Sequence, residues 1–185
     1  TNIPPHCASE LVDGLLALLD NRDISVGELM RMIPGPDFPT AGIIFGSEGI
    51  KSAYETGRGI VVMRGRATVE ADERKDRESL VITELPFQVN KSKLMERIAG
   101  LVRDKKLEGI SDLRDESDRD GIRVVLDLKK GQIPTIVLNK LYTMTPLQTS
   151  FGTILLALVN NTPQVLTLKG LLSEFLNHRQ EVVVR

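Results

Sequence analysis

The chain has 185 residues, 41% of them hydrophobic, and a formal net charge of -1 at pH 7. This length is enough to bury one substantial core, and the near-neutral charge does not indicate a strongly basic nucleic-acid binder. The sequence contains no Trp, so a base-stacking platform is not expected. Cys7 is the only cysteine, which excludes an internal disulfide, and the apolar runs are too short for a membrane span. We therefore expect a soluble chain from a reducing compartment.

The charges are distributed unevenly along the sequence. Residues 1–50 carry two basic and seven acidic side chains, whereas residues 51–110 carry thirteen basic and ten acidic ones. A solvated surface explains a modest asymmetry of this kind unless the spacing of the cations indicates a site. The middle third is therefore where we look for an anion-binding surface.

Two helices and a linker are predicted near the N-terminus. Apolar residues recur at helical spacing over 11–19, and this helix should end near Asp20. Ser25 and Glu28 have the spacing of a capping box, which opens a second short helix that closes before Pro34. The segment 33–42, IPGPDFPTAG, has three prolines and two glycines, so we place an ordered linker and a domain boundary there.

The next segment has the pattern of a hairpin followed by a helix. Alternation predicts a strand over 60–70, with Arg64 and Arg66 on one face. The charged stretch 71–78 is predicted to be a turn, and residues 80–85 to return as the second strand. Pro86 ends that strand, and a helix begins at Lys91, after Asn90.

The remaining pattern continues to mix the two kinds of element. It predicts a strand over 122–128 and a helix over 133–142. A last pair of strands is predicted over 153–159 and 165–168. The order of elements indicates an α+β fold, with helices packed on one face of a mostly antiparallel sheet. Residues 171–183 have helical spacing with no capping Gly or Pro after them, and position 1 is not Met. We therefore expect a piece of a longer protein.

Several possible catalytic or metal motifs are weaker than their structural alternatives. Residues 116–121, ESDRDG, resemble the start of a calcium loop that Asp127 would close, but a strand follows instead of a helix, so a surface turn is favoured. Two histidines and one cysteine do not form a zinc set. Tyr54 and Tyr142 lack a neighbouring activating base, so packing is the favoured interpretation of both. No catalytic or metal residue is predicted.

Long, specific strings in the sequence resemble the A subunits of bacterial type IIA DNA topoisomerases, and DNA gyrase more than topoisomerase IV. The resemblance covers the whole chain. It is carried by TNIPPH at 1–6, IPGPDFPTAG at 33–42, AYETGRG at 53–59, QVNK at 88–91, EGISDLRDESDRDG at 108–121, LQTSFG at 147–152 and HRQEVVVR at 178–185.

The resemblance implies part of an enzyme that cuts both strands of a DNA duplex through phosphotyrosyl links, passes a second duplex through, and reseals the break. The family's nucleophilic tyrosine follows an arginine in a segment before Thr1, and neither tyrosine of this chain matches it. Magnesium and ATP would be held by the gyrase B subunit, with no cofactor in this segment. The implied partners are double-stranded DNA, the gyrase B subunit, plus a second A subunit in an A2B2 heterotetramer. The implied location is the bacterial cytoplasm, or an organelle in a plastid-bearing eukaryote, with no membrane association.

The resemblance also implies three parts. Residues 1–33 would be the helical end of the winged-helix cleavage region, 34–167 an α+β tower domain, and 168–185 the start of a coiled-coil helix. At Cys7 many relatives have Asn, so the helix that follows lacks a good cap.

The tower of this family supports the bent gate DNA, which suggests a role for the cations at 91 and 93. Lysines are mildly unfavourable at the positive end of a helix dipole, but a capped helix start with two added cations suits a phosphate. We therefore predict DNA contacts by Asn90, Lys91 and Lys93, and weaker ones by Arg64 and Arg66. The alternative for the two lysines is that they point into water.

Two other functional classes remain open at this point. The segment could be a structural strut that spaces other domains without contacting DNA, or a stand-alone α+β enzyme domain. The lack of a convergent acid, base and nucleophile set counts against the second. Salt-dependent DNA binding would separate the DNA-contacting segment from the strut.

Overall fold

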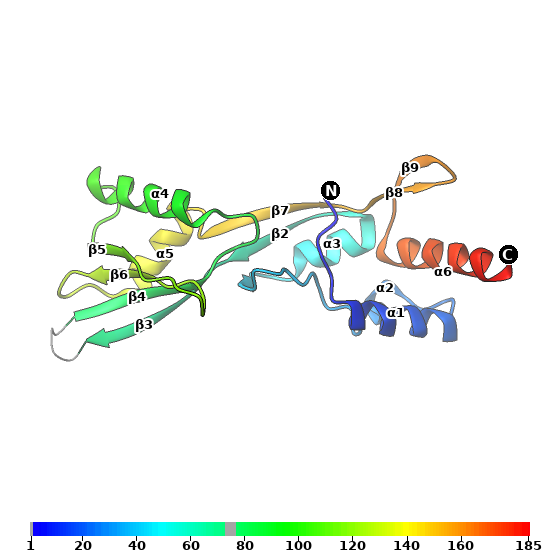
Figure 1. Ribbon diagram of the computed structural model, residues 1–185. Coiled ribbons are helices and arrows are strands. Elements are labelled where there is room, and N and C mark those ends of the chain that lie inside the picture. The colour runs from blue at the N-terminus through cyan, green and yellow to red at the C-terminus, as the bar shows by residue number, and fades with distance from the viewer. Residues whose placement is uncertain (1, 73–76) are drawn as a thin grey trace. The chain divides into compact units, whose positions relative to one another are not determined.

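The computed structural model describes residues 2–72 and 77–185, and Figure 1 shows its helices and strands. The helices are α1 (Ala8–Asp20), α2 (Val26–Leu29), α3 (Glu48–Thr56), α4 (Lys91–Arg103), α5 (Pro134–Met144) and α6 (Leu168–Val184). The strands are β1 (Ile43–Ile44), β2 (Arg58–Arg64), β3 (Arg66–Asp72), β4 (Arg77–Glu84), β5 (Ile110–Asp115), β6 (Val124–Leu128), β7 (Gln148–Ile154), β8 (Leu156–Val159) and β9 (Thr162–Val165).

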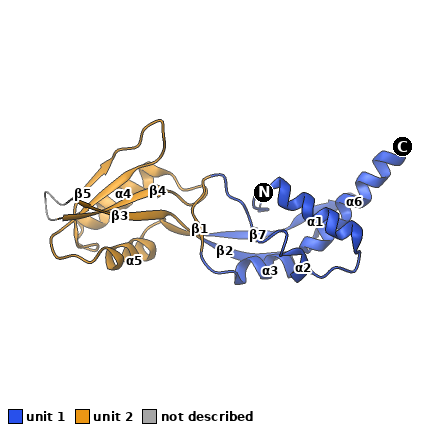
Figure 2. Ribbon diagram, turned by 90° about the horizontal axis from the view of Figure 1, so that it is seen from below, with its two compact units in different colours: residues 1–39, 45–62, 150–185 blue, residues 40–44, 63–149 orange. Residues whose placement is uncertain are grey.

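The chain divides into two compact units, coloured separately in Figure 2. The first comprises residues 1–39, 45–62 and 150–185, and the second residues 40–44 and 63–149. β1, β2 and β7 form a three-stranded sheet in the order β1-β2-β7. The division of the chain at residues 33 and 167 into cleavage region, tower and coiled coil stays a prediction.

The second unit is built on a four-stranded sheet in the order β3-β4-β6-β5, and every neighbouring pair is antiparallel. Leu80, Ile82, Val124 and Leu126 alternate along β4 and β6 and share one core with α4 and α5. Those helices contribute Leu94, Ile98, Leu101, Val137 and Leu141 to it. The predicted α+β class, with helices on one face of a mostly antiparallel sheet, is confirmed.

The first unit contains α1, α2, α3, α6 and the β8–β9 hairpin. Gly14 of α1 allows a close approach, because a Cβ there would lie 2.6 Å from the Ile33 Cδ1 atom. The predicted capping box is present, since the Ser25 side chain accepts from the Glu28 amide and the Glu28 carboxylate accepts from the Ser25 amide. Cys7 precedes α1 and makes no side-chain capping bond.

The single strand predicted over 60–70 is wrong, because Gly65 separates β2 from β3. The Gly65 amide donates to the Leu147 carbonyl at 2.8 Å, and the Tyr142 hydroxyl donates to the Gly65 carbonyl at 3.0 Å. A Cβ on Gly65 would lie 2.7 Å from the Glu84 carbonyl oxygen. At this close approach the hydrogen bonding of the β2 sheet ends and that of the β3 sheet begins. The alternation of residues in the sequence cannot predict such a break.

The predicted strands near the C-terminal end are also placed differently. The strand over 153–159 is interrupted at Leu155, whose amide donates to the Gly57 carbonyl at 2.8 Å. The returning strand is β9, and Asn160 and Asn161, both with positive φ, join it to β8. α6 begins at Leu168, after its cap Thr167, so of the strand predicted over 165–168 only Val165 is in a strand, as the last residue of β9.

The hairpin of β3 and β4 is longer than the sequence predicts. Pairing extends to Asp72 and Arg77, so part of the predicted turn over 71–78 is strand. The rest of that turn, residues 73–76, lies outside the described part of the chain. The sequence reasoning missed α3, β1, β5 and most of β7. α3 ends at Gly57, which has a φ of 81°.

Candidate nucleic-acid interface

The start of α4 has the capped geometry that the sequence predicts. Asn90 is the N-cap, and its side-chain oxygen accepts from the Lys93 amide at 3.1 Å. Its backbone is extended, as a cap requires. Leu94 and Ile98 are fully buried on the inner side of the helix, so the first turn is fixed both by its cap and by the core. The Lys93 side chain is exposed to solvent.

Lys91 neither points freely into water nor stands free for a phosphate. Its ammonium lies 2.7 Å from a carboxylate oxygen of Asp115, at the end of β5, and both side chains are about one-third exposed. The Lys91 ammonium, followed by hydrogen bonds from Ser117, lowers the pKa of Asp115 to about 2. A lysine at the positive helix end therefore ties α4 to the neighbouring strand, which neither sequence alternative anticipated.

Arg64 is held against an aromatic ring. Its guanidinium carbon lies 4.6 Å from the centroid of the Tyr142 ring, within the range of a cation–π interaction. Its Nε atom donates to the Gln148 side-chain oxygen at 2.6 Å. The Tyr142 hydroxyl bonds to the Gly65 carbonyl, so this cluster anchors the break between β2 and β3.

Arg66 belongs to a different strand and a different cluster. Its Nε atom lies 3.1 Å from Glu84, whose carboxylate also accepts from the Gly42 amide at 2.8 Å. The Gly42 amide, then the Arg66 guanidinium, lowers the pKa of Glu84. Arg64 and Arg66 lie in separate sheets on either side of Gly65, so the prediction that one continuous strand presents both on a single face is wrong.

The predicted DNA contacts therefore divide into two groups. Lys91, Arg64 and Arg66 have protein partners, whereas no ion pair of Lys93 occurs among residues 2–72 and 77–185. The recorded contacts do not join the α4 start to the cluster around Gly65. The assignment of all five residues to DNA contacts stays a prediction, and among the cations Lys93 and Arg66 are exposed whereas Lys91 and Arg64 are half-buried.

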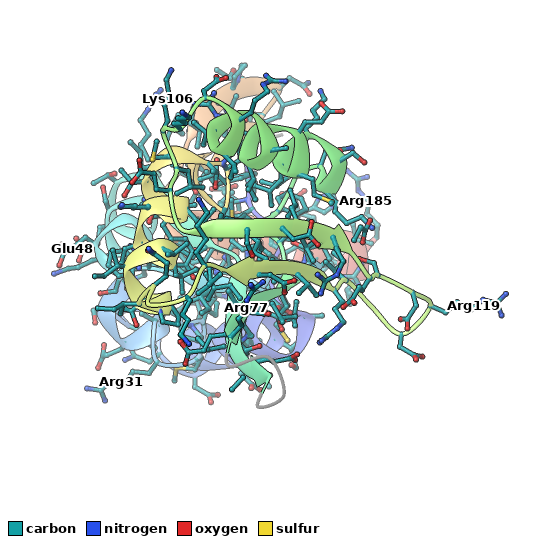
Figure 3. The ribbon with its side chains drawn as sticks, turned by 90° about the vertical axis from the view of Figure 1, so that its left-hand side faces the viewer. Arg31, Glu48, Arg77, Lys106, Arg119 and Arg185 are labelled. Carbon is teal, nitrogen blue, oxygen red and sulfur yellow. The ribbon has the colours of Figure 1, made fainter. Side chains whose placement is uncertain are left out.

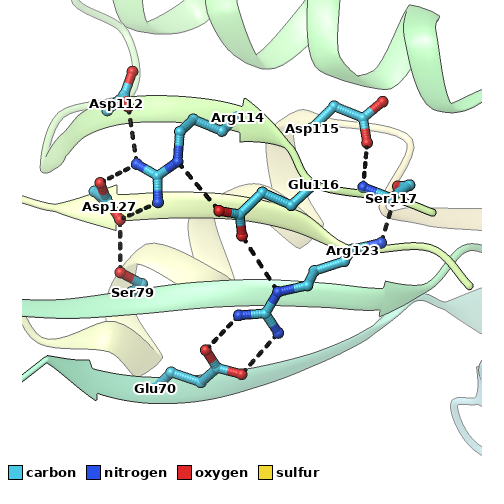
Figure 4. A network of polar contacts seen from close by, with 9 residues as sticks. All are labelled: Glu70, Ser79, Asp112, Arg114, Asp115, Glu116, Ser117, Arg123 and Asp127. Carbon is cyan, nitrogen blue, oxygen red and sulfur yellow. Dashed lines mark hydrogen bonds and ion pairs between the residues drawn. The ribbon is translucent and has the colours of Figure 1, made fainter. Parts of the chain in front are cut away.

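The outer face of the β3-β4-β6-β5 sheet carries a polar network that the sequence analysis did not identify (Figure 4). Arg114 contacts Asp112, Glu116 and Asp127, and Arg123 makes a two-pronged contact with Glu70 at 2.7 and 2.9 Å. These carboxylates raise the pKa of both guanidinium groups.

This network covers apolar side chains. Val81 and Val125 are 0% and 3% exposed, although they alternate with the residues that face α4 and α5. Arg114 is the cross-strand partner of Val125, so its stem stands on the same side of the sheet. Asp127, which would close the calcium loop considered above, accepts from Ser79 at 2.7 Å and from Arg114. The arginine side chains of this network therefore cover the buried valines on this side of the sheet.

Both tyrosines are engaged within the protein. Tyr54 is 1% exposed, and its hydroxyl lies 2.6 Å from the His6 Nε2 atom. Burial raises the pKa of Tyr54 and of Tyr142, which opposes formation of a nucleophilic phenolate.

In the part of the chain that the structure describes, no group of three or more His, Cys, Asp or Glu side chains is placed to hold a metal ion. No described helix is long and apolar enough to cross a membrane.

Comparison with known proteins agrees with the family resemblance. The family of DNA gyrase and topoisomerase IV A subunits matches residues 1–185. The chain is 57% identical to the DNA gyrase A subunit of Pseudomonas aeruginosa, over all of this chain and 20% of the relative. It is 54% and 52% identical to those of Salmonella typhimurium and Escherichia coli, over all of this chain and 21% of each relative. The chain thus spans about a fifth of the length of these relatives.

Proposed function

Because the chain belongs to the family of DNA gyrase and topoisomerase IV A subunits, we propose that it is a segment of a gyrase A subunit, within the region that breaks and rejoins DNA. The observation that carries this proposal is the similarity over every residue of the chain to proteins named as DNA gyrase A subunits. The parent protein would introduce negative supercoils by ATP-dependent passage of one duplex through another. Topoisomerase IV, which separates linked duplexes, is the alternative.

The segment would support the gate DNA rather than cut it. Tyr54 is buried against His6, and Tyr142 is bonded to Gly65, so neither is placed as the nucleophile. The cutting tyrosine would lie elsewhere in the parent protein, and the B subunit would supply magnesium and ATP. The partners would be double-stranded DNA, the B subunit, plus a second A subunit in an A2B2 assembly, located with the bacterial DNA in the cytoplasm.

The structural strut is a second candidate for the role of this segment within the parent. The observation in its favour is that Lys91, Arg64 and Arg66 have partners inside the protein. Residues already neutralised by Asp115 or Glu84 have less charge to offer a phosphate. Lys93 and the helix dipole remain the features in favour of a DNA contact.

The proposal is tested with the full-length A subunit that contains this segment, combined with its B subunit. Relaxed plasmid, magnesium and ATP are added, and the products are separated by gel electrophoresis. The expected product is negatively supercoiled plasmid. Relaxation and unlinking without supercoiling would favour topoisomerase IV, and no change of topology with active, folded subunits would overturn the proposal.

A further inference from the structure

The side of α5 that faces away from the core carries apolar side chains around a cation. A shallow groove of about 290 Å³ lies on this side, lined by Ile136, Asn139, Lys140, Thr143 and Met144. These positions are spaced by three and four residues, so they share one side of the helix. Figure 3 shows side chains projecting from α5, the yellow helix. We call these five residues, together with Ile133, the α5 outer stripe.

The apolar residues at the start of the stripe are not used to pack the second unit. Val137 and Leu141, on the inner side of the helix, are 1% and 0% exposed and belong to the core. Ile133 and Ile136 are 57% and 50% exposed. Single exposed apolar residues are common on protein surfaces, but these two lie one turn apart and lead into the groove. A row at this spacing is the surface against which a second helix packs.

The first turn of α5 is built in a way that its own stability does not explain. Its N-cap is Ile133, which makes no side-chain capping bond. An apolar side chain is a poor cap, because it offers no acceptor to the amides of the first turn. The chain therefore places an exposed isoleucine where Ser, Asp or Asn would stabilise the helix, and a binding surface explains this local cost. An acidic side chain from a partner would meet the positive end of the helix dipole there.

The chain around the stripe is positively charged. Residues 128–148 contain three lysines and no acidic residue. Lys140 lines the groove, and Lys129 lies between β6 and α5. Both are exposed, and neither has an ion pair within residues 2–72 and 77–185. The partner that complements this surface has acidic residues beside an apolar face.

We propose that the α5 outer stripe is a docking site for an acidic amphipathic helix of a partner protein. The apolar side of that helix would fill the groove over Ile136 and Met144, and its carboxylates would pair with Lys140 and Lys129. Ile133 and Met144 are separated along the axis of α5 by about 16 Å, which is room for about three turns of a partner helix.

A nucleic-acid backbone suits the stripe less well than such a helix. Phosphates are bound by cations and polar donors, whereas Ile133 and Ile136 offer only carbon. Covering these two side chains with apolar groups would remove their surface from water, which favours association. The inference goes beyond the proposed function and does not depend on it.

The test measures binding of a labelled synthetic peptide to the full-length A subunit that contains this segment. The peptide has about four helical turns, with Leu on one side and Glu on the other, and fluorescence anisotropy follows its binding. It should bind the wild type, and Ile136→Glu and Lys140→Glu should each weaken binding about tenfold or more. Both positions are exposed, so both variants should keep the melting temperature of the wild type.

The matched control is Val69→Glu/Lys106→Glu, which makes the same two kinds of change elsewhere on the second unit. Val69 is 49% exposed, and Lys106, labelled in Figure 3, is also exposed. Peptide affinity should be unchanged in this control. A second peptide with Lys in place of Glu should bind the wild type more weakly than the acidic peptide does, and should prefer Lys140→Glu to the wild type.

Each result decides the inference. No binding of the acidic peptide to the folded wild-type subunit, or equal losses in the test and control variants, would overturn it. Equal affinity of the acidic and basic peptides would also overturn it, because contact would then involve the apolar side chains alone. A loss of duplex affinity in Lys140→Glu with unchanged peptide affinity would assign the surface to nucleic acid instead. Supercoiling by the wild-type complex is measured separately, so its absence contradicts only the proposed function.

Discussion

The His6 Nε2 atom lies 2.6 Å from the Tyr54 hydroxyl, and the His6 Nδ1 atom lies 2.8 Å from the Pro4 carbonyl oxygen. A carbonyl only accepts, so Nδ1 carries the hydrogen, and the neutral ring must accept from the tyrosine at Nε2. Protonation of His6 would place a second donor opposite the Tyr54 hydroxyl and force that hydroxyl to turn away. This contact joins the N-terminal segment to α3.

The His6–Tyr54 contact should make stability depend on pH. Burial lowers the pKa of His6 and outweighs the Pro4 carbonyl, Glu10 and Asp37, which raise it. The folded state therefore binds fewer protons than the unfolded state below the ordinary pKa of 6.5. The contribution of His6 to the free energy of unfolding is then fully present above pH 6.5. It decreases as the pH falls from 6.5 toward the lowered pKa of the folded state.

Urea unfolding at pH 7.5 and pH 5.5 measures this dependence. His6→Gln should make stability less sensitive to pH across the interval, and Tyr54→Phe should cost about 1 kcal/mol at pH 7.5 through the lost hydrogen bond. An unchanged difference between the two pH values in His6→Gln would contradict this account.

The Lys91–Asp115 pair predicts that one acidic substitution strengthens DNA binding. Asp115→Asn removes the partner of the Lys91 ammonium, which then becomes available to a phosphate at the α4 start. Affinity for a fluorescent duplex should rise, and the salt slope should increase by about 0.9 if one contact is gained. In Lys91→Ala/Asp115→Asn the slope increase should be absent. A gain of slope that persists without Lys91 would show that general charge, not this lysine, is responsible.

Asn90 and Gly65 show what the sequence could and could not predict. The Asn90 cap, the buried side of α4 and the helix-on-sheet class follow from local spacing, and the structure contains them. The break at Gly65 depends on Leu147, Tyr142 and Glu84, which are distant in sequence. The partners of the predicted cations were missed for the same reason, since Asp115 meets Lys91 only once β5 is placed beside α4.

Asn90→Ala should cost about 1 kcal/mol of stability, because the Lys93 amide loses its capping acceptor. Chemical denaturation with a circular dichroism signal measures this loss. The control is Gly100→Ala in the same helix, which fits without a clash and should instead stabilise the protein by up to about 1 kcal/mol. Equal changes in the free energy of unfolding for the two substitutions would show that the stability of α4 does not determine the stability of the protein.

Gly65→Ala should destabilise the second unit by about 1–3 kcal/mol. The added methyl would lie 2.5 Å from the Leu147 Cδ1 atom and 2.7 Å from the Glu84 carbonyl oxygen. A leucine side chain can rotate away, but the carbonyl of a paired strand cannot. The control is Gly152→Ala in β7, where a Cβ meets nothing within 4 Å, and urea unfolding compares the two variants. A loss at Gly65 no larger than at Gly152 would contradict the close-packing explanation.

Replacing both tyrosines of this chain should leave DNA cleavage intact in the gyrase that we propose as its parent. A nucleophilic tyrosine needs an accessible hydroxyl and a way to lose its proton, whereas Tyr54 is buried against His6 and Tyr142 donates to Gly65. In the full-length A subunit with its B subunit, Tyr54→Phe/Tyr142→Phe should still form protein-linked DNA ends, with a modest loss of thermal stability. Denaturing gels of labelled plasmid measure the covalent product. Complete loss of linked ends in a variant that remains folded and binds duplex normally would place a cutting residue in this segment.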